Sequence, residues 1–285
     1  MSDPGLFGPD SVTWRVQSEP VMWVAGLRAL LLQAVHPAAM AGVIDHSDFR
    51  ADPWGRLRRT ADYVGTVAFG STDEVEAAGA RVRGVHAKIR GIDARTGRTY
   101  SARDPHLLRW VHCCEVESFL TVYQRSGGGL SPAEVDAFYA EQTRAAAVVG
   151  IAPSTVPASA AEMASYFRRM RPELVADTRA LRAARYVLLP PMPGRMQLTT
   201  PARPAWFAVA GLAGALLPRW ARRLYRLPGL PTTDVAATLA LRSLQLALQS
   251  APERYRVGPH LRAARERMAQ SDSGDALGAS PAHGG

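Results

Sequence analysis

The sequence predicts an all-α protein with a single domain, and three observations support this prediction. Hydrophobic residues recur with helical spacing along most of the chain, whereas period-two alternation between hairpin turns is scarce. Strong helix starts occur at Asp52-Pro53, Asp104-Pro105 and Ser131-Pro132, where a capping side chain precedes proline. Finally, 47% hydrophobic residues in a chain of 285 can fill one large core.

The expected elements follow from these signals in chain order. An irregular segment over 1–18 precedes a helical domain over 19–270, and a small, polar, disordered tail covers 271–285. His36-Pro37 interrupts the first buried helix, since the residue before proline avoids the α region. Helices are expected near 21–35, 53–68, 72–90, 105–124, 132–150, 159–170, 172–186, 205–225, 233–249 and 260–270, with connections at 44–49, 93–99, 127–129 and 190–193.

Charge and cysteine content limit the classes of function. The net charge is +9, almost all of it from arginine, and Lys88 is the only lysine. Because the arginines are interleaved with acids and form no basic arm, we expect no nucleic-acid partner. The adjacent Cys113 and Cys114 form no disulfide framework, and the N-terminus lacks a secretory signal, so a cytoplasmic protein is expected.

The longest apolar run covers 205–217, which is too short to span a bilayer. A buried helix is the simplest interpretation. A peripheral membrane contact is the alternative, suggested by Trp206, Phe207 and Trp220 near the ends of the run and by Arg219, Arg222 and Arg223 beyond it. The sequence predicts no oligomeric state.

His86 is the strongest candidate for chemistry. Val82 lies four residues before it and Ile89 three after it, so the imidazole shares an apolar helix face. A neutral imidazole among aliphatic side chains is typical of a haem ligand. It is equally typical of a hydrogen-bonded core histidine, which is the more common case.

In the preceding helix, one face carries Arg56, Arg59, Thr60, Tyr63 and Val67, and all of these except Val67 are polar. Such groups on an inward face are costly unless they meet an anion or a polar ligand. A solvated basic face is the alternative interpretation.

A non-haem iron site is a competing hypothesis. His112 and Glu115 lie three residues apart, with Glu117 nearby and Glu141 on the next helix. Bundle di-iron sites need two Glu-x-x-His motifs, however, and this chain offers one pair in reversed order. Alternatively, His112 is a core histidine whose ring nitrogens form hydrogen bonds within the protein. No Gly-x-Ser-x-Gly elbow or phosphate-binding glycine loop indicates a hydrolase or nucleotide enzyme.

Three ordered segments carry a family resemblance. They are 30–71 (LLLQAV…VAFGS), 82–91 (VRGVHAKIRG) and 100–112 (YSARDPHLLRWVH). Together they resemble the oxygenase mpaB / rubber oxygenase catalytic domain family, the latex-clearing-protein-like group, over roughly residues 6–186. The resemblance implies a globin-like helical core that holds haem b. It also implies oxygenase activity with dioxygen on an apolar, isoprenoid or otherwise unsaturated, substrate.

The resemblance also assigns roles to residues. His86 corresponds to the axial iron ligand, with Tyr63 and Val82 beside the cofactor. Arg56, Arg59 and Thr60 correspond to the family's Arg-x-x-Lys-Thr motif and are the expected catalytic residues, Arg56 also contacting haem.

The chain departs from latex-clearing proteins in two ways. Arg59 replaces a lysine, and a guanidinium has no lone pair to offer iron. No acid lies within 25–44, where latex-clearing proteins carry a distal glutamate. His36 and His46 are possible acid–base groups in its place, or else core or loop-capping residues. A non-catalytic haem or apolar-ligand carrier would use the same pocket and remains an alternative.

Overall fold

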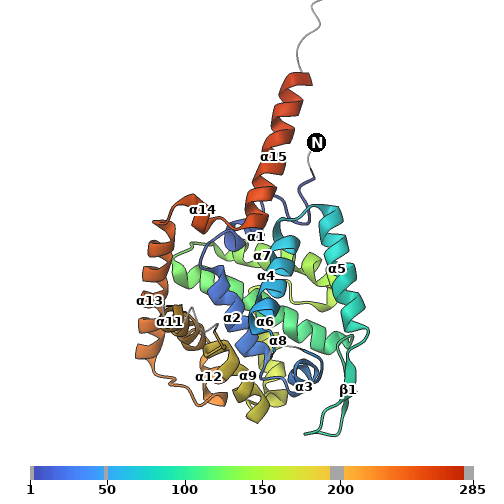
Figure 1. Cartoon of the computed structure of the whole chain (residues 1–285), viewed down its shortest axis with the longest axis vertical. Helices are drawn as coiled ribbons and strands as arrows, with labels where there is room; N and C mark the ends of the chain where they lie inside the picture. Colours follow the sequence, from blue (N-terminus) through green and yellow to red (C-terminus); the bar gives the residue numbers. More distant parts are fainter. Residues whose placement is uncertain (1–2, 48–50, 193–201, 279–285) are drawn as a thin grey trace, which may run out of the picture.

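The computed structural model describes residues 3–47, 51–192 and 202–278, and these are almost entirely helical (Figure 1). This confirms the all-α prediction. Within those ranges the strands are limited to one antiparallel hairpin, β1 (Arg90–Ile92) and β2 (Thr99–Ser101), in which Gly91 pairs with Tyr100. A globin-like arrangement of the helices remains a prediction.

The helices up to the centre of the chain are α1 (Val12–Gln17), α2 (Met22–Gln33), α3 (Pro37–His46), α4 (Pro53–Phe69), α5 (Thr72–His86) and α6 (Pro105–Ser126). Those that follow are α7 (Pro132–Val148), α8 (Ala160–Met170), α9 (Thr178–Leu188), α11 (Ala202–Ala215), α12 (Arg219–Leu224), α13 (Pro231–Gln249), α14 (Glu253–Arg256) and α15 (Pro259–Gly278). Two 3₁₀ turns are η1 (Pro153–Thr155) and η2 (Arg171–Glu173).

The helix starts read from the sequence have their expected caps. The Asp52 carboxylate accepts a hydrogen bond from the Gly55 amide at 2.8 Å, and Asp104 caps α6 in the same way through His106. Ser131 and Glu134 form a reciprocal capping box at α7. Each contact satisfies an amide that the first helical turn leaves without a partner.

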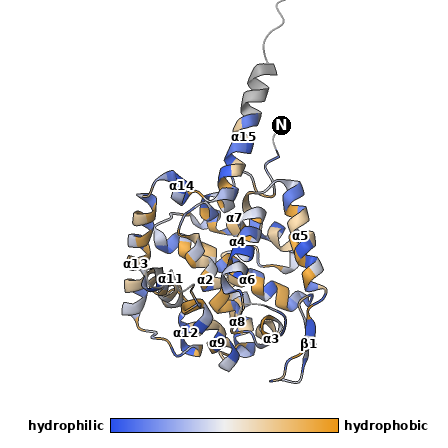
Figure 2. Cartoon of the chain, viewed as in Figure 1, coloured by the Kyte–Doolittle hydropathy of each residue, from blue (hydrophilic) through white to orange (hydrophobic). Residues whose placement is uncertain are grey.

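Packing of α2 against α6 forms the centre of the core. Most of α2 is buried, including Val24 and Leu32, which have no solvent exposure. On α6, Trp110 is fully enclosed, and Cys113 and Cys114 are buried free thiols whose pKa values burial raises. Figure 2 shows hydrophobic residues concentrated on helices of the body.

A buried ion pair lies within the α2–α6 contact. The Arg28 side chain is 1% exposed, and its Nη1 donates to Glu117 on α6 at 2.6 Å. The same guanidinium donates to the Ser118 hydroxyl at 2.6 Å and to the Leu216 carbonyl at 2.9 Å. These contacts join α2, α6 and the end of α11 through one fully hydrogen-bonded cation.

Several boundaries differ from the predictions. Residues 1–18 are not uniformly irregular, because Ser11 caps the short helix α1. The 205–225 helix is two helices, α11 and α12, because Pro218 lacks the amide needed to continue the first. The backbone of α15 continues to Gly278, past the expected start of the tail, and residues 279–285 lie outside the described part.

Of the aromatic residues in and near the apolar run, two make contacts within the protein and one is exposed. Trp206 donates its indole N–H to the Val187 carbonyl at 2.9 Å, and Trp220 contacts the Phe167 ring. Phe207 is 52% exposed. No single helix in the described part is long and apolar enough to cross a membrane; α2 and α3 meet that criterion only jointly, bent by 106°. Peripheral membrane contact stays a prediction.

The Arg28→Ala variant is expected to lose about 3–5 kcal/mol of unfolding free energy, because it leaves Glu117 without its partner at a largely buried position. Urea unfolding followed by circular dichroism measures this loss.

Arg15→Ala is the matched control, since Arg15 pairs with Glu134 at 2.6 Å on the surface, with both side chains over one-third exposed. We expect this control to lose less than about 1 kcal/mol. Equal losses from the two variants would show that burial of Arg28 is not what makes its pair important.

Candidate functional site

A mainly apolar cavity of about 300 Å³ lies where α2, α3, α4, α5, α6 and α9 come together. Its volume is at the lower end of the range typical of small-molecule sites. Apolar lining residues include Leu30, Ala34, Val43, Leu57, Leu108 and Val111, and the polar ones include Gln33, His46, Arg56, His86, Tyr100 and Tyr186.

His86 lies on the wall of this cavity, at the last residue of α5. Its Nδ1 atom is buried and has no hydrogen-bond partner in the described part of the chain. Burial lowers the pKa of His86, so the imidazole is neutral at pH 7 and one ring nitrogen offers a lone pair. Helix α5 ends at His86, whereas the sequence predicted that it would continue to Arg90.

Arg56 also lines the cavity, near the start of α4. One Nη atom donates a hydrogen bond to the Ser47 hydroxyl, which fixes the side chain against the end of α3. Burial, and secondarily the charge of Arg59, lowers the Arg56 pKa, but a guanidinium stays protonated under ordinary conditions. The cavity therefore contains a fixed cation, and the lining residues that the structure describes include no carboxylate.

Arg59 and Thr60 do not line the cavity, although they share a helical face with Arg56. Both are exposed, and Arg59 pairs with Asp52 at 3.2 Å on the surface. The buried residues of α4 lie near its two ends, whereas residues 58–62 are exposed around a full turn. Sharing a face with Arg56 is therefore insufficient to bring a side chain into the cavity, and the structure lends no support to catalytic roles for Arg59 and Thr60.

Tyr63 and Val82, expected beside the cofactor, are partly buried and lie outside the set of lining residues. The Tyr63 pKa is raised, first by burial and then by the charge of Glu115. This interaction links the centre of α4 with α6. Val82 lies one turn before His86 on α5. Cofactor contact by either residue stays a prediction.

Glu115 follows the cavity residues Leu108 and Val111 on one face of α6, by seven and four positions. Burial raises its pKa to about 7, and it makes no hydrogen bond or ion pair with any described residue. Near neutral pH this carboxyl is therefore partly protonated and can donate or accept a proton. The sequence indicated Glu115 only as a possible iron ligand.

The non-haem iron hypothesis is not supported by the arrangement of its four residues. Glu117 is paired with Arg28, and Glu141 accepts hydrogen bonds from the amide and hydroxyl of Thr13 at 2.8 and 2.7 Å. His112 is buried, and burial lowers its pKa to about 4. Two of the four candidate ligands are thus committed elsewhere, and the described residues do not assemble this set as a metal cluster.

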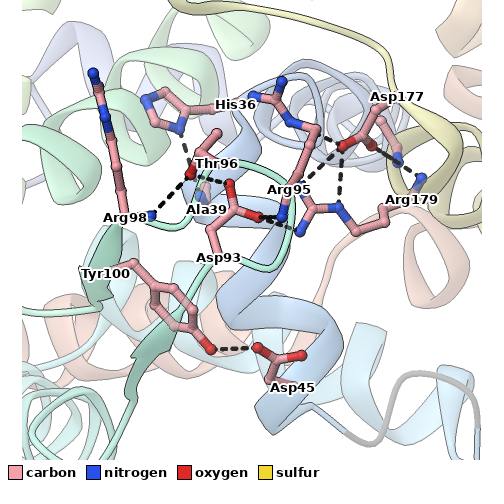
Figure 3. Close-up of polar contacts among 11 residues, drawn as sticks. His36, Ala39, Asp45, Asp93, Arg95, Thr96, Arg98, Tyr100, Asp177 and Arg179 are labelled. Atoms are coloured by element: carbon pink, nitrogen blue, oxygen red, sulfur yellow. Dashed lines mark hydrogen bonds and ion pairs between the residues drawn. The ribbon is translucent and has the colours of Figure 1, made fainter.

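The two histidines of the 36–46 segment have different surroundings. His46 lines the cavity, and its ring lies 6.2 Å from that of Tyr100, whose hydroxyl donates to Asp45 at 2.6 Å. His36 does not line the cavity. It caps α3 through a long Nδ1 contact with the Ala39 amide (Figure 3). Its ring also lies near that of His106. Only His46 is therefore positioned as an acid–base group in the cavity.

The β-hairpin and α9 supply a wall that the sequence did not predict. Asp93 in the hairpin turn accepts a hydrogen bond from Arg179 at 2.7 Å, while Arg179 also pairs with Asp177 (Figure 3). These contacts hold the hairpin against α9 and bring Tyr100 and Tyr186 to the same cavity. Strands of three residues are too short for alternation to reveal them, and only the Gly-containing turn was recognised.

At pH 8 the Glu115→Gln variant is expected to be more stable than the parent by about 3–4 kcal/mol. The Glu115 carboxyl ionises with a pKa of about 4.3 in the unfolded chain and of about 7 in the folded one. The parent therefore loses stability as the pH rises from the first value to the second, because ionisation then favours the unfolded state. Below the unfolded value both states are protonated and the difference disappears. Urea unfolding at pH 4.5 and pH 8 measures it.

Glu76→Gln is the control, because Glu76 is an exposed residue paired with Arg83. We expect little pH-dependent change from it. A Glu115→Gln variant without greater stability at pH 8 would contradict the raised pKa.

The comparison with protein families gives one match. The model for the "ER-bound oxygenase mpaB/B'/Rubber oxygenase, catalytic domain" covers residues 14–249, which include the cavity and all the candidate residues discussed above. Comparisons with curated proteins and with solved structures give no significant match. The chain therefore belongs to the mpaB/rubber oxygenase catalytic domain family, as its ordered motifs indicated.

Proposed function

We propose that this protein is a haem b-dependent oxygenase that acts with dioxygen on a small apolar substrate in the cavity lined by His86 and Arg56. Family membership supports oxygenase activity. The observation that carries the haem assignment is a neutral imidazole without a hydrogen-bond partner, that of His86, on the wall of an apolar cavity that also contains Arg56.

The residues at the cavity fit a haem group in their chemistry. Neutral imidazole is a common axial ligand of haem iron. The buried Nδ1 atom of His86 has no hydrogen-bond partner among the described residues, so no such bond holds the ring away from a cofactor. Arg56 provides the fixed positive charge that an anionic propionate needs. The aliphatic wall residues suit both a macrocycle and an apolar substrate.

Bound haem would supply a redox-active iron for reaction with dioxygen. The chain's own residues would bind and orient the ligands, exclude water and transfer protons. Leu57, Leu108 and Val111 would bind apolar surface and exclude water, while Arg56 would orient an anionic group. His46 lines the same cavity as His86, and its ring nitrogen can hold or transfer a proton.

The cavity favours a small substrate over a polymer. Its volume of about 300 Å³ is at the lower end of the range for ligand sites, and this space must hold the haem as well as the substrate, so little room is left for a long chain. Within the described part of the chain, the lining residues also include no carboxylate that could replace the distal glutamate of latex-clearing proteins. We infer that this chain carries out related oxygen chemistry on a different, compact apolar molecule.

The first prediction from this proposal concerns His86. The purified protein is expected to show a Soret absorption band, and His86→Ala is expected to lose most of it because the axial bond is removed. Absorption spectra normalised to protein concentration measure haem content, and circular dichroism checks the fold.

His46→Ala is the matched control, since His46 lines the same cavity and is expected to affect turnover more than haem content. Full haem retention in His86→Ala would refute the ligand assignment. Oxygen uptake by the reduced protein with a panel of small unsaturated substrates separates an oxygenase from a non-catalytic carrier, because a carrier consumes no oxygen with substrate.

The second prediction separates two arginines on α4. Arg56→Leu is expected to weaken haem binding about tenfold or more, because a charge-assisted hydrogen bond contributes about 1.5–3 kcal/mol. Arg59→Leu is expected to change it by less than about twofold, since Arg59 is exposed and pairs with Asp52. Haem titration followed in the Soret region measures both dissociation constants. A larger loss from Arg59→Leu would reverse the assignment.

A further inference from the structure

A second cluster of potential ligands lies at the start of α6, outside the lining of the cavity. It contains His36, which caps α3, His106 in the first turn of α6, and Glu173 in η2. One ligand atom from each of these side chains lies within 4.8 Å of the other two. Three segments that are distant in the sequence therefore meet at one point.

The geometry of this cluster leaves one nitrogen without a partner. His106 Nε2 lies 2.9 Å from Glu173 Oε2, which by itself is an ordinary surface hydrogen bond. His36 Nε2 lies 3.8 Å from the same oxygen, beyond hydrogen-bond distance. The His36 residue is only 5% exposed, and its Nε2 is buried with no hydrogen-bond partner among the described groups. Burying such an atom is unfavourable unless something binds it.

We propose that His36, His106 and Glu173 form a binding site for a divalent metal ion of the zinc type. Two imidazoles and one carboxylate are a ligand set that zinc uses, with a fourth position open to water. The side chains of His106 and Glu173 are 42% and 49% exposed, so that position faces solvent. Metal–ligand bonds of about 2.0–2.2 Å require ligand atoms within about 4 Å of one another, which a small rotation of exposed His106 provides.

The surroundings of the cluster suit a cation. Burial, and secondarily the charge of His106, lowers the pKa of His36, so its imidazole is neutral and offers a lone pair to a metal ion. The carboxylates of Glu173 and Asp104 act in the opposite direction and attract a cation. Binding through Nε2 places the His36 ring proton on Nδ1, where the backbone carbonyl of His36 itself can accept it. The competing contact from the Ala39 amide is 3.5 Å long, so little is lost when the tautomer changes.

A metal ion at this cluster would fix two walls of the cavity relative to one another. Ala38 and Ala39 follow His36 in α3, and Leu107 follows His106 in α6, and all three line the cavity. Glu173 would tie η2 to both helices. The ion would therefore have a structural role, and the inference is independent of haem binding at His86.

Zinc titration of the chelator-treated full-length protein by calorimetry tests this proposal. One zinc ion per chain is expected, and His106→Ala and Glu173→Gln are each expected to weaken binding at least about tenfold. Both positions are half exposed, so these variants are expected to fold. Zinc should also raise the melting temperature of the parent and leave that of His106→Ala nearly unchanged.

His260→Ala is the matched control, because His260 Nε2 lies 3.6 Å from Asp62 in a histidine–carboxylate pair without a third ligand. It should bind zinc like the parent. Absence of zinc binding in the parent, or equal losses from His260→Ala and His106→Ala, would overturn the proposal. His86→Ala should keep zinc affinity, so failure of the haem assignment and failure of the zinc assignment are distinguishable.

Discussion

The contact between α2 and α6 is the constraint on which the rest of this structure depends. Near its middle, Arg28 and Glu117 form a buried ion pair that fixes how the two helices meet. Toward the other end the same two helices supply cavity residues, including Leu30 on α2 and Leu108 on α6. Because both contributions come from two rigid elements, the position of these two cavity walls follows from core packing.

Burial on the α6 side of the core favours neutral side chains. It lowers the pKa of His112 to about 4 and raises that of Glu115 to about 7. It also lowers the pKa of His86 on α5. A neutral imidazole is the form that binds a metal, and a carboxyl that titrates near neutrality is the form that exchanges protons. Burying these groups costs free energy, and the protonation states that result are those that redox and proton chemistry need.

Local signals predicted the helices well and the site only in part. Capping by Asp52 and Ser131 depends on neighbours within four residues, so the sequence alone predicts those starts. Placement of Arg59 depends instead on how α4 meets the body, and helical spacing contains no such information. For the same reason, the wall supplied by α9 was missed, since it depends on the long-range pair between Arg179 and Asp93. Side chains positioned by tertiary contacts cannot be located from periodicity.

The segment from His36 to His46 shows how one short helix can serve two sites. Pro37 starts α3 anew after α2, so the ring of His36 lies at the capping position, beside His106 and Glu173. Ten residues later, His46 ends the same helix and lines the cavity. A single straight helix through residue 37 would not place a capping side chain there. The proline therefore separates one histidine, suited to structural metal binding, from another suited to acid–base work.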